Sequence, residues 1–243
     1  MGSSPCHQHS FQNWRTSASV LPRRSAVLSQ HLRPRSPRFD VELTMSSTAG
    51  FDPFADLVIA QGERPAHVAE VNLRALSPFQ RALLVIDGTV TKFIEAYTME
   101  PVHVERLHHE TRPLEQDNFW LEVPAQTAIA FREVVLRGAY SETLYAYATS
   151  LLVPSHLPGG FASALEAEPS GLGRVLLDSG AESRREVLWF GRERLSTSRP
   201  SLRSTDIAGD YLTRTYRVIS GGAPMMLINE KFPLGLEDLP AHH

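Results

Sequence analysis

The sequence has very little cysteine and no long apolar run. Its one cysteine, Cys6, cannot form a disulfide framework or a cysteine-rich metal site within the chain. No apolar run approaches the roughly 20 residues that a membrane-spanning helix needs, so we expect no membrane partner. A reducing, cytoplasmic setting is compatible with this composition.

The sequence also lacks an excess of basic residues. Its 24 Lys and Arg stand against 27 Asp and Glu, which gives a net charge of −3. A nucleic-acid-binding domain normally presents a basic face, so we expect no nucleic-acid partner. The glycine motifs of dinucleotide- and phosphate-binding proteins are missing, as is the GxSxG elbow of hydrolases, so these motifs support no enzyme class.

The first 44 residues differ in composition from the rest. They carry six arginines and two acids, a net charge of +4, which leaves −7 for residues 45–243. The stretch has no continuous apolar core of the secretory type, and its composition cannot bury enough surface to fold. Two explanations stay open: residues 1–44 are a transit-like or disordered leader, or Met45 is the true start. We favour the second, and both place the folded domain at 45–243.

Helix signals come first in this domain. Ser77 and Pro78 are a typical helix start, with Ser as N-cap and Pro in the first turn, and predict a helix that continues to Ile86. After an Asp-Gly break, Thr89 can cap a second helix over 90–97. Further helical segments are expected at 160–166 and from residue 170.

Strand signals dominate from residue 101 onward. Strands are expected at 101–107 and 185–192, and 128–137 with 143–153 indicates a hairpin. The clearest hairpin joins 211–220 to 225–232 through a Gly-Gly-Ala-Pro turn. Few helices, five or six strands and short turns predict an α+β fold with an antiparallel sheet of about six strands.

Glu230 is the first candidate for chemistry. Alternate residues of a strand share a face, which places Glu230 with Met226, Ile228 and Phe232 on the more apolar side. A buried carboxyl group must be paired or protonated, and the protonated form suits a general acid near neutral pH. The alternatives are a satisfied ion pair inside the sheet or a half-exposed edge position.

Arg132 is the second candidate. It shares a strand face with small or apolar residues at 128, 130, 134 and 136, which leave room beside its guanidinium group. A buried arginine stays charged and needs an anion, and its fork matches a carboxylate. Glu230, another structural acid or a ligand carboxylate would each satisfy it.

Two helix starts, at 88–91 and 170–173, form the third candidate. Each can leave free backbone N–H groups at a positive helix end, which attracts anions, although ordinary capping is by itself the favoured explanation. Other features are set aside: His103, His108 and His109 lack a fixed acidic partner for a metal site. Arg214 and Arg217 lie on opposite strand faces, so at most one of them points inward.

Four segments together resemble a known family. RTYRVISGGAPMMLINEKFP (214–233) strongly resembles the closing hairpin of the actinobacterial branch of the chorismate pyruvate-lyases. DGTVTKFIE (87–95), FREVVLRG (131–138) and GLGRVLL (171–177) resemble the same family in the same order. The resemblance covers about residues 80–235.

This resemblance implies a fold and a reaction. It implies a six-stranded antiparallel sheet whose helices cover a closed pocket, and removal of pyruvate from chorismate to leave 4-hydroxybenzoate without a metal or organic cofactor. The family's carboxylate-binding arginine falls on Arg132 and its acid on Glu230. The two product-holding backbone amides fall on Val90 and Leu172.

The main hypothesis is therefore a carbon–oxygen lyase with a small-molecule carboxylate substrate, as a monomer or homodimer. In it, Glu230 protonates the departing enolpyruvyl group while Arg132 anchors a carboxylate. A second hypothesis keeps the fold and acid for a lyase, dehydratase or cyclase of secondary metabolism. A third is a non-catalytic domain that binds aromatic acids.

Overall fold

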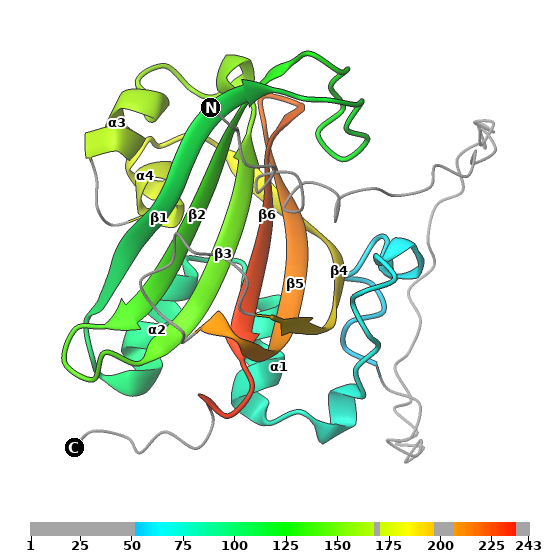
Figure 1. The fold of residues 1–243 in the computed structure, drawn as a ribbon, viewed down its shortest axis with the longest axis vertical. Coiled ribbons are helices and arrows are strands. Elements are labelled where there is room, and N and C mark those ends of the chain that lie inside the picture. The colour runs from blue at the N-terminus through cyan, green and yellow to red at the C-terminus, as the bar shows by residue number, and fades with distance from the viewer. Residues whose placement is uncertain (1–51, 168–170, 197–206, 237–243) are drawn as a thin grey trace, which may run out of the picture. The chain divides into compact units, whose positions relative to one another are not determined.

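A six-stranded antiparallel sheet forms the body of the protein (Figure 1). The structure, a computed structural model, describes residues 52–167, 171–196 and 207–236. The expectation for residues 1–44 lies outside these ranges. The compact unit that begins at Phe54 has the strand order β1-β2-β3-β6-β5-β4, with every neighbouring pair antiparallel. The predicted α+β class and antiparallel sheet are confirmed.

The chain order of the strands puts β6 in the middle of the sheet. The first three strands form a meander, the chain then crosses to the far edge as β4, and the β5–β6 hairpin returns to place β6 beside β3. The strands are β1 (Val102–Pro113), β2 (Ala128–Gly138), β3 (Leu144–Leu152), β4 (Ser183–Leu195), β5 (Gly209–Ser220) and β6 (Ala223–Pro233).

Strand β1 is longer than the predicted 101–107. Its second half is polar, and the pairing with β2 shifts between Arg106 and His108. An edge strand needs no apolar residues on an exposed face, and charges and bulges are typical of it. Apolar alternation therefore could not reveal where this strand ends.

The described residues form four α-helices, two before β1 and two between β3 and β4. They are α1 (Pro78–Val85), α2 (Val90–Thr98), α3 (Phe161–Ala167) and α4 (Leu172–Asp178), with short 3-10 turns η4 (Gln61–Glu63), η5 (Leu73–Ala75) and η6 (Pro154–His156). The predicted cap of α1 is present: Gln80 N donates to Ser77 Oγ (3.2 Å), and Ser77 N donates to Gln80 Oε1 (3.0 Å). Among the described helices, none is long and apolar enough to cross a membrane.

All four helices pack on the same face of the sheet. Leu83 and Ile94 of α1 and α2 belong to a core cluster with Leu212 and Phe232 of the sheet. The residues of α3 and α4 that pack on this face form a second cluster with β2, β3, β5 and β6; it contains Phe161, Leu165, Val175, Leu176, Ala130, Leu152, Tyr216 and Ile228. In Figure 1, α1 and α2 lie at the lower end of the sheet and α3 and α4 at the upper end.

Buried Glu100 fastens the α2–β1 junction to the β2–β3 turn. Its carboxylate accepts hydrogen bonds from Tyr145 Oη (2.7 Å), from the backbone N–H groups of Tyr140 and Ser141 (both 2.6 Å) and from Ser141 Oγ (2.9 Å). Gly138 makes this approach possible, because a Cβ there would lie 2.3 Å from Glu100 Oε2. Burial alone would raise the pKa of Glu100, but these hydrogen bonds lower it to about 2.

Replacing this carboxylate gives a stability prediction. The folded pKa of about 2 lies below the ordinary value of 4.5, so the charged form stabilises the fold at neutral pH. That contribution is lost as the pH falls from 4.5 towards 2. We expect Glu100→Gln to lower the free energy of unfolding at pH 7 by about 1–3 kcal/mol. Urea unfolding at pH 7, 4 and 3 should show the difference from wild type narrowing with acid. Glu105→Gln, at a half-exposed site, is the control, and a pH-independent difference contradicts the prediction.

Candidate active site

A pocket lies between the sheet and the starts of helices α2 and α4. Its floor is formed largely by apolar residues such as Val134, Met226 and Ile228. All four residues that sequence and resemblance singled out line it: Val90, Arg132, Leu172 and Glu230. The structure thus brings the four together, while their roles stay predictions.

The strand register explains why Arg132 and Glu230 reach the same pocket. Arg132 pairs with Ser150 of β3, and Glu230 pairs with Ala148, two residues along the same strand. Both side chains therefore point to the helix-covered face. Two strand spacings of about 4.8 Å each separate their backbones across the sheet. Ala148 lies between the two positions and is too small to fill the space.

Glu230 is held by two donors from the neighbouring strand β5. Arg214 lies directly opposite it in the ladder, and Arg214 Nε donates to Glu230 Oε2 at 2.8 Å. Tyr216 Oη donates to Glu230 Oε1 at 3.1 Å. The side chains of Arg214 and Glu230 are 1% and 12% exposed, so the pair is largely removed from water. One of the interpretations left open by the sequence, an ion pair inside the sheet, is therefore correct for Glu230.

Arg214 also connects the acid to the start of α2. Its Nη1 donates to the backbone oxygen of Ile86 (3.0 Å), the residue that ends α1. Its guanidinium carbon lies 5.1 Å from the centre of the Tyr216 ring. Within the described residues, its buried Nη2 makes no hydrogen bond. A single arginine thus sets the position of Glu230 relative to the loop that leads into α2.

Tyr216 serves Glu230 as a neutral donor. Burial raises the pKa of its hydroxyl, and the negative charge of Glu230 raises it further, while Arg214 and Arg185 act in the opposite direction. The phenol therefore stays protonated across the ordinary pH range. Its proton is available to hold Glu230 Oε1 throughout.

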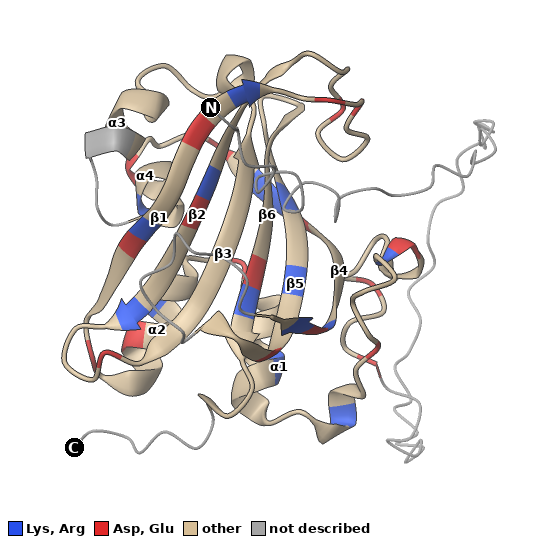
Figure 2. Cartoon of the chain, in the orientation of Figure 1, with Lys and Arg blue, Asp and Glu red and all other residues tan. Residues whose placement is uncertain are grey.

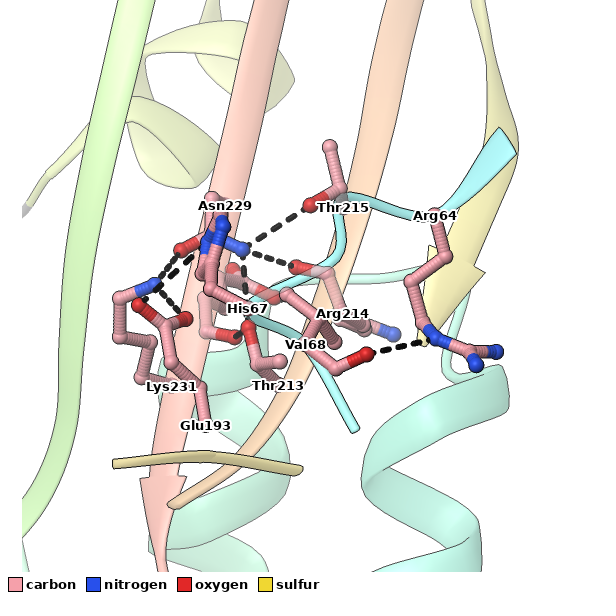
Figure 3. A network of polar contacts seen from close by, with 10 residues as sticks. Arg64, His67, Val68, Glu193, Thr213, Arg214, Thr215, Asn229 and Lys231 are labelled. Atoms are coloured by element: carbon pink, nitrogen blue, oxygen red, sulfur yellow. Dashed lines mark hydrogen bonds and ion pairs between the residues drawn. The ribbon is translucent and has the colours of Figure 1, made fainter. Parts of the chain in front are cut away.

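A polar network on the opposite face of the sheet holds the backbone behind this pair (Figure 3). Thr213 Oγ1 donates to the backbone oxygen of Glu230 (3.1 Å), and Asn229 Nδ2 lies 3.3 Å from the backbone oxygen of Arg214. Asn229 Nδ2 also contacts the hydroxyl groups of Thr213 and Thr215, at 2.8 and 2.9 Å. Lys231 joins Asn229 to Glu193. Figure 2 shows how charged residues lie within the central strands as well as at the edges.

The two helix starts approach each other because glycine permits it. A Cβ at Gly173 would lie 2.8 Å from Thr89 Cγ2, and one at Gly171 would lie 3.2 Å from Val104 Cγ2. Gly171 also has φ +89°, a conformation that side chains disfavour. Neither helix start has a side-chain cap. Their first N–H groups therefore have no acceptor inside the helix or from a capping side chain.

Sequence reasoning gave no role to three residues of this site. Arg214 and Tyr216 hold Glu230, and Arg185 of β4 lines the same pocket. As for metals, no group of three or more His, Cys, Asp or Glu side chains in the described part of the chain is placed to hold an ion.

The Arg214–Glu230 pair gives a prediction about stability. Removing one member of a buried ion pair leaves the other charge uncompensated, at a cost of about 3–5 kcal/mol. We expect Arg214→Met to lower the free energy of unfolding by about that amount, and Arg214→Met combined with Glu230→Gln to be more stable than the single arginine variant. Urea unfolding of both single variants and the double variant measures the coupling, and strictly additive effects would show that the two side chains do not interact.

Comparisons with known proteins show what the chain is similar to. The family model described as "Chorismate pyruvate-lyase Rv2949c-like" matches residues 84–239. A protein of Mycobacterium tuberculosis named chorismate pyruvate-lyase is 25% identical over 177 residues, which cover 68% of this chain and 84% of that protein. Its namesake from Mycobacterium leprae is 25% identical over 162 residues, covering 66% and 76%.

Solved structures are similar at lower identity. The effector domain of PhnF from Mycobacterium smegmatis is 11% identical with a TM-score of 0.48, and the match covers 61% of this chain and 90% of that domain. The family model, in contrast, matches the sequence itself over well more than half of the chain, and the matched range contains the pocket residues from Gly88 to Glu230. The chain belongs to the Rv2949c-like chorismate pyruvate-lyase family.

Proposed function

We propose that this protein removes pyruvate from chorismate and releases 4-hydroxybenzoate. The observation that carries the proposal is a single pocket in which Arg132, Glu230 and two uncapped helix starts meet, in a chain of this family. The two mycobacterial relatives are both named chorismate pyruvate-lyase, which supports the lyase activity proposed for this chain.

The reaction mainly needs one side chain that is positioned to accept a proton and to donate it again. The C3–O bond of chorismate breaks, its electron pair leaves with the enolpyruvyl group, and the ring loses its C4 hydrogen as it becomes aromatic. The methylene carbon of the leaving group gains a proton to give pyruvate. No net oxidation or reduction takes place, so the proposal invokes no cofactor.

Glu230 is proposed to carry this proton. Arg214 and Tyr216 both donate to its carboxyl oxygens and hold the group in place at the pocket. Glu230 would first take the C4 proton as a base and then act as the general acid towards the departing enolpyruvyl carbon. Proton transfer by a placed side chain typically contributes about 10²–10⁴-fold to the rate.

Arg132 is proposed to hold the ring carboxylate. It is buried on the pocket face, where a guanidinium fork would bind that group in two places. The backbone amides of Val90 and Leu172, at the two helix starts, would donate further hydrogen bonds to the ligand's oxygens. The apolar floor would exclude water and keep the substrate in one orientation.

Wild-type protein incubated with chorismate tests the function directly. We expect equal amounts of 4-hydroxybenzoate and pyruvate, measured by chromatography and by a coupled lactate dehydrogenase assay. Chorismate without protein measures the spontaneous background. No product above that background at high protein concentration would overturn the proposal and favour another substrate for the same site.

Two substitutions test the assigned roles. We expect Glu230→Gln to lower kcat by about 10²–10⁴-fold, since Gln cannot carry the proton. Arg132→Ala should raise KM and lower kcat/KM by about tenfold or more, through loss of a charge-assisted contact. Initial rates at several chorismate concentrations separate the two effects.

Matched controls lie outside the pocket. Glu186→Gln removes a carboxylate that pairs with Arg217 (2.7 Å), and Arg137→Ala removes an arginine near the far end of β2 that pairs with Glu105 (3.6 Å). Both controls should stay near wild-type activity. Near-wild-type rates for Glu230→Gln would eliminate the proton-carrier role.

A further inference from the structure

A second arginine lines the pocket at a distance from Arg132. Arg185 lies on β4 opposite Val218 of β5, and both residues line the pocket. Its side chain is 16% exposed. The positive charge of Arg185 also acts on the Tyr216 hydroxyl and tends to lower its pKa, which places the guanidinium group near the acid's own partner. The pocket therefore has cationic side chains on two different strands.

The partner of Arg185 in the structure is a surface carboxylate. Arg185 Nη1 donates to Asp87 Oδ1 at 3.1 Å, and the Asp87 side chain is 74% exposed. An ion pair to an exposed carboxylate contributes little, because water already solvates that group. Asp87 directly precedes Gly88, which lines the pocket. A ligand carboxylate that enters the pocket could replace Asp87 at small cost.

Arg185 is not required to balance the charge of Glu230. Arg214 already pairs with Glu230 at 2.8 Å, and Tyr216 occupies the other oxygen. No direct contact joins Arg185 to Glu230 among the described residues. The pocket thus has two arginines, Arg132 and Arg185, in addition to the arginine that neutralises the acid, which suits a ligand with more negative charge than one carboxylate.

The two arginines stand at opposite sides of Glu230. Arg132 is on β2 and Arg185 on β4, with β3, β6 and β5 between them. Four strand spacings of about 4.8 Å put their backbones roughly 19 Å apart, and both side chains line the pocket. In this strand order Glu230 lies between them, on β6; along β6 it is four residues from Met226, which shares the cross-strand row of Val218 and Arg185. Chorismate has the same order of groups: a ring carboxylate, the reacting C3–C4 bond and the enolpyruvyl carboxylate.

We propose that Arg185 is the anchor for the second, enolpyruvyl carboxylate, and that the pocket thereby selects dicarboxylates over monocarboxylates. This inference rests on the proposed function and adds a binding residue to it. When the substrate binds, its enolpyruvyl carboxylate replaces the Asp87 carboxylate as the hydrogen-bond acceptor of the Arg185 guanidinium group. After the C3–O bond breaks, the two carboxylates belong to separate molecules, so Arg185 holds pyruvate and Arg132 holds 4-hydroxybenzoate.

The test compares a dicarboxylate with a monocarboxylate in matched variants. We expect Arg185→Met to raise KM for chorismate by about tenfold or more. Its Kd for 4-hydroxybenzoate, measured by calorimetry, should stay unchanged, because that ligand lacks the enolpyruvyl group. Unchanged binding of 4-hydroxybenzoate also shows that the variant is folded. Arg185→Lys should fall between wild type and Arg185→Met, since it keeps the charge and loses the fork.

Arg184→Met is the matched control. It removes the same charge from the preceding residue, whose side chain is 67% exposed and pairs with Glu186 (2.7 Å) outside the pocket. It should leave KM for chorismate unchanged. Asp87→Asn should lower that KM, because it removes the carboxylate that competes for Arg185.

The outcomes separate this proposal from the proposed function. An unchanged chorismate KM in Arg185→Met, an equal loss for both ligands, or an equal effect of Arg184→Met overturns the role of Arg185. A wild-type protein that binds chorismate without converting it overturns the proposed function alone, and Kd for chorismate then replaces KM in the same comparison. A wild-type protein that binds neither compound overturns both.

Discussion

The ion pair between Glu230 and Arg214 is the interaction on which the site depends. Two charges taken out of water lose their hydration, and their mutual attraction repays that loss only with good geometry and further hydrogen bonds. Here the further bonds come from Tyr216 and from the backbone oxygen of Ile86. A buried pair of this kind is weak grounds for stability, and the proposed role as a proton carrier gives a separate reason for a carboxyl group at the pocket.

The sheet topology decides what can meet this pair. Because the chain leaves β3 for the far edge and returns, its last strand, β6, lies in the centre of the sheet, with neighbours on both sides. The crossing segment contains α3 and α4, which pack over the same face as α1 and α2. The start of α4 therefore comes beside the start of α2, although about 80 residues separate them in the sequence. Gly173 allows the close approach, and the pocket forms below it.

Much of this could be predicted from the sequence, because strand faces follow directly from alternation. That rule placed Arg132 and Glu230 on apolar faces, and Ser77 and Thr89 marked the starts of α1 and α2, although only Ser77 forms the expected side-chain cap. The partner of Glu230 could not be found in this way. At the turn, Ser220 pairs with Ala223, and if this register continued along the hairpin Arg214 would lie opposite Asn229. An irregularity between Val218 and Ile219 shifts the register by one residue, so that Arg214 lies opposite Glu230 instead. A similar shift between Val187 and Trp189 on β4 interrupts the alternation that follows Arg185. Such irregularities depend on packing across the sheet and leave no local pattern in the chain.

The polar network on the opposite face of the sheet stabilises the observed register between β5 and β6. A slip of β6 by one residue would turn Glu230 away from the pocket and bring Asn229 or Lys231 into it. The observed register is the one in which Asn229 meets Thr213 and Thr215 and Lys231 meets Glu193. Any slip would leave these buried polar groups without partners, at a cost of about 1–3 kcal/mol for each neutral group and more for the charged ones. Two consecutive residues thus have complementary roles: Asn229 specifies the pairing of the strands, and Glu230 can face the pocket because that pairing is specified.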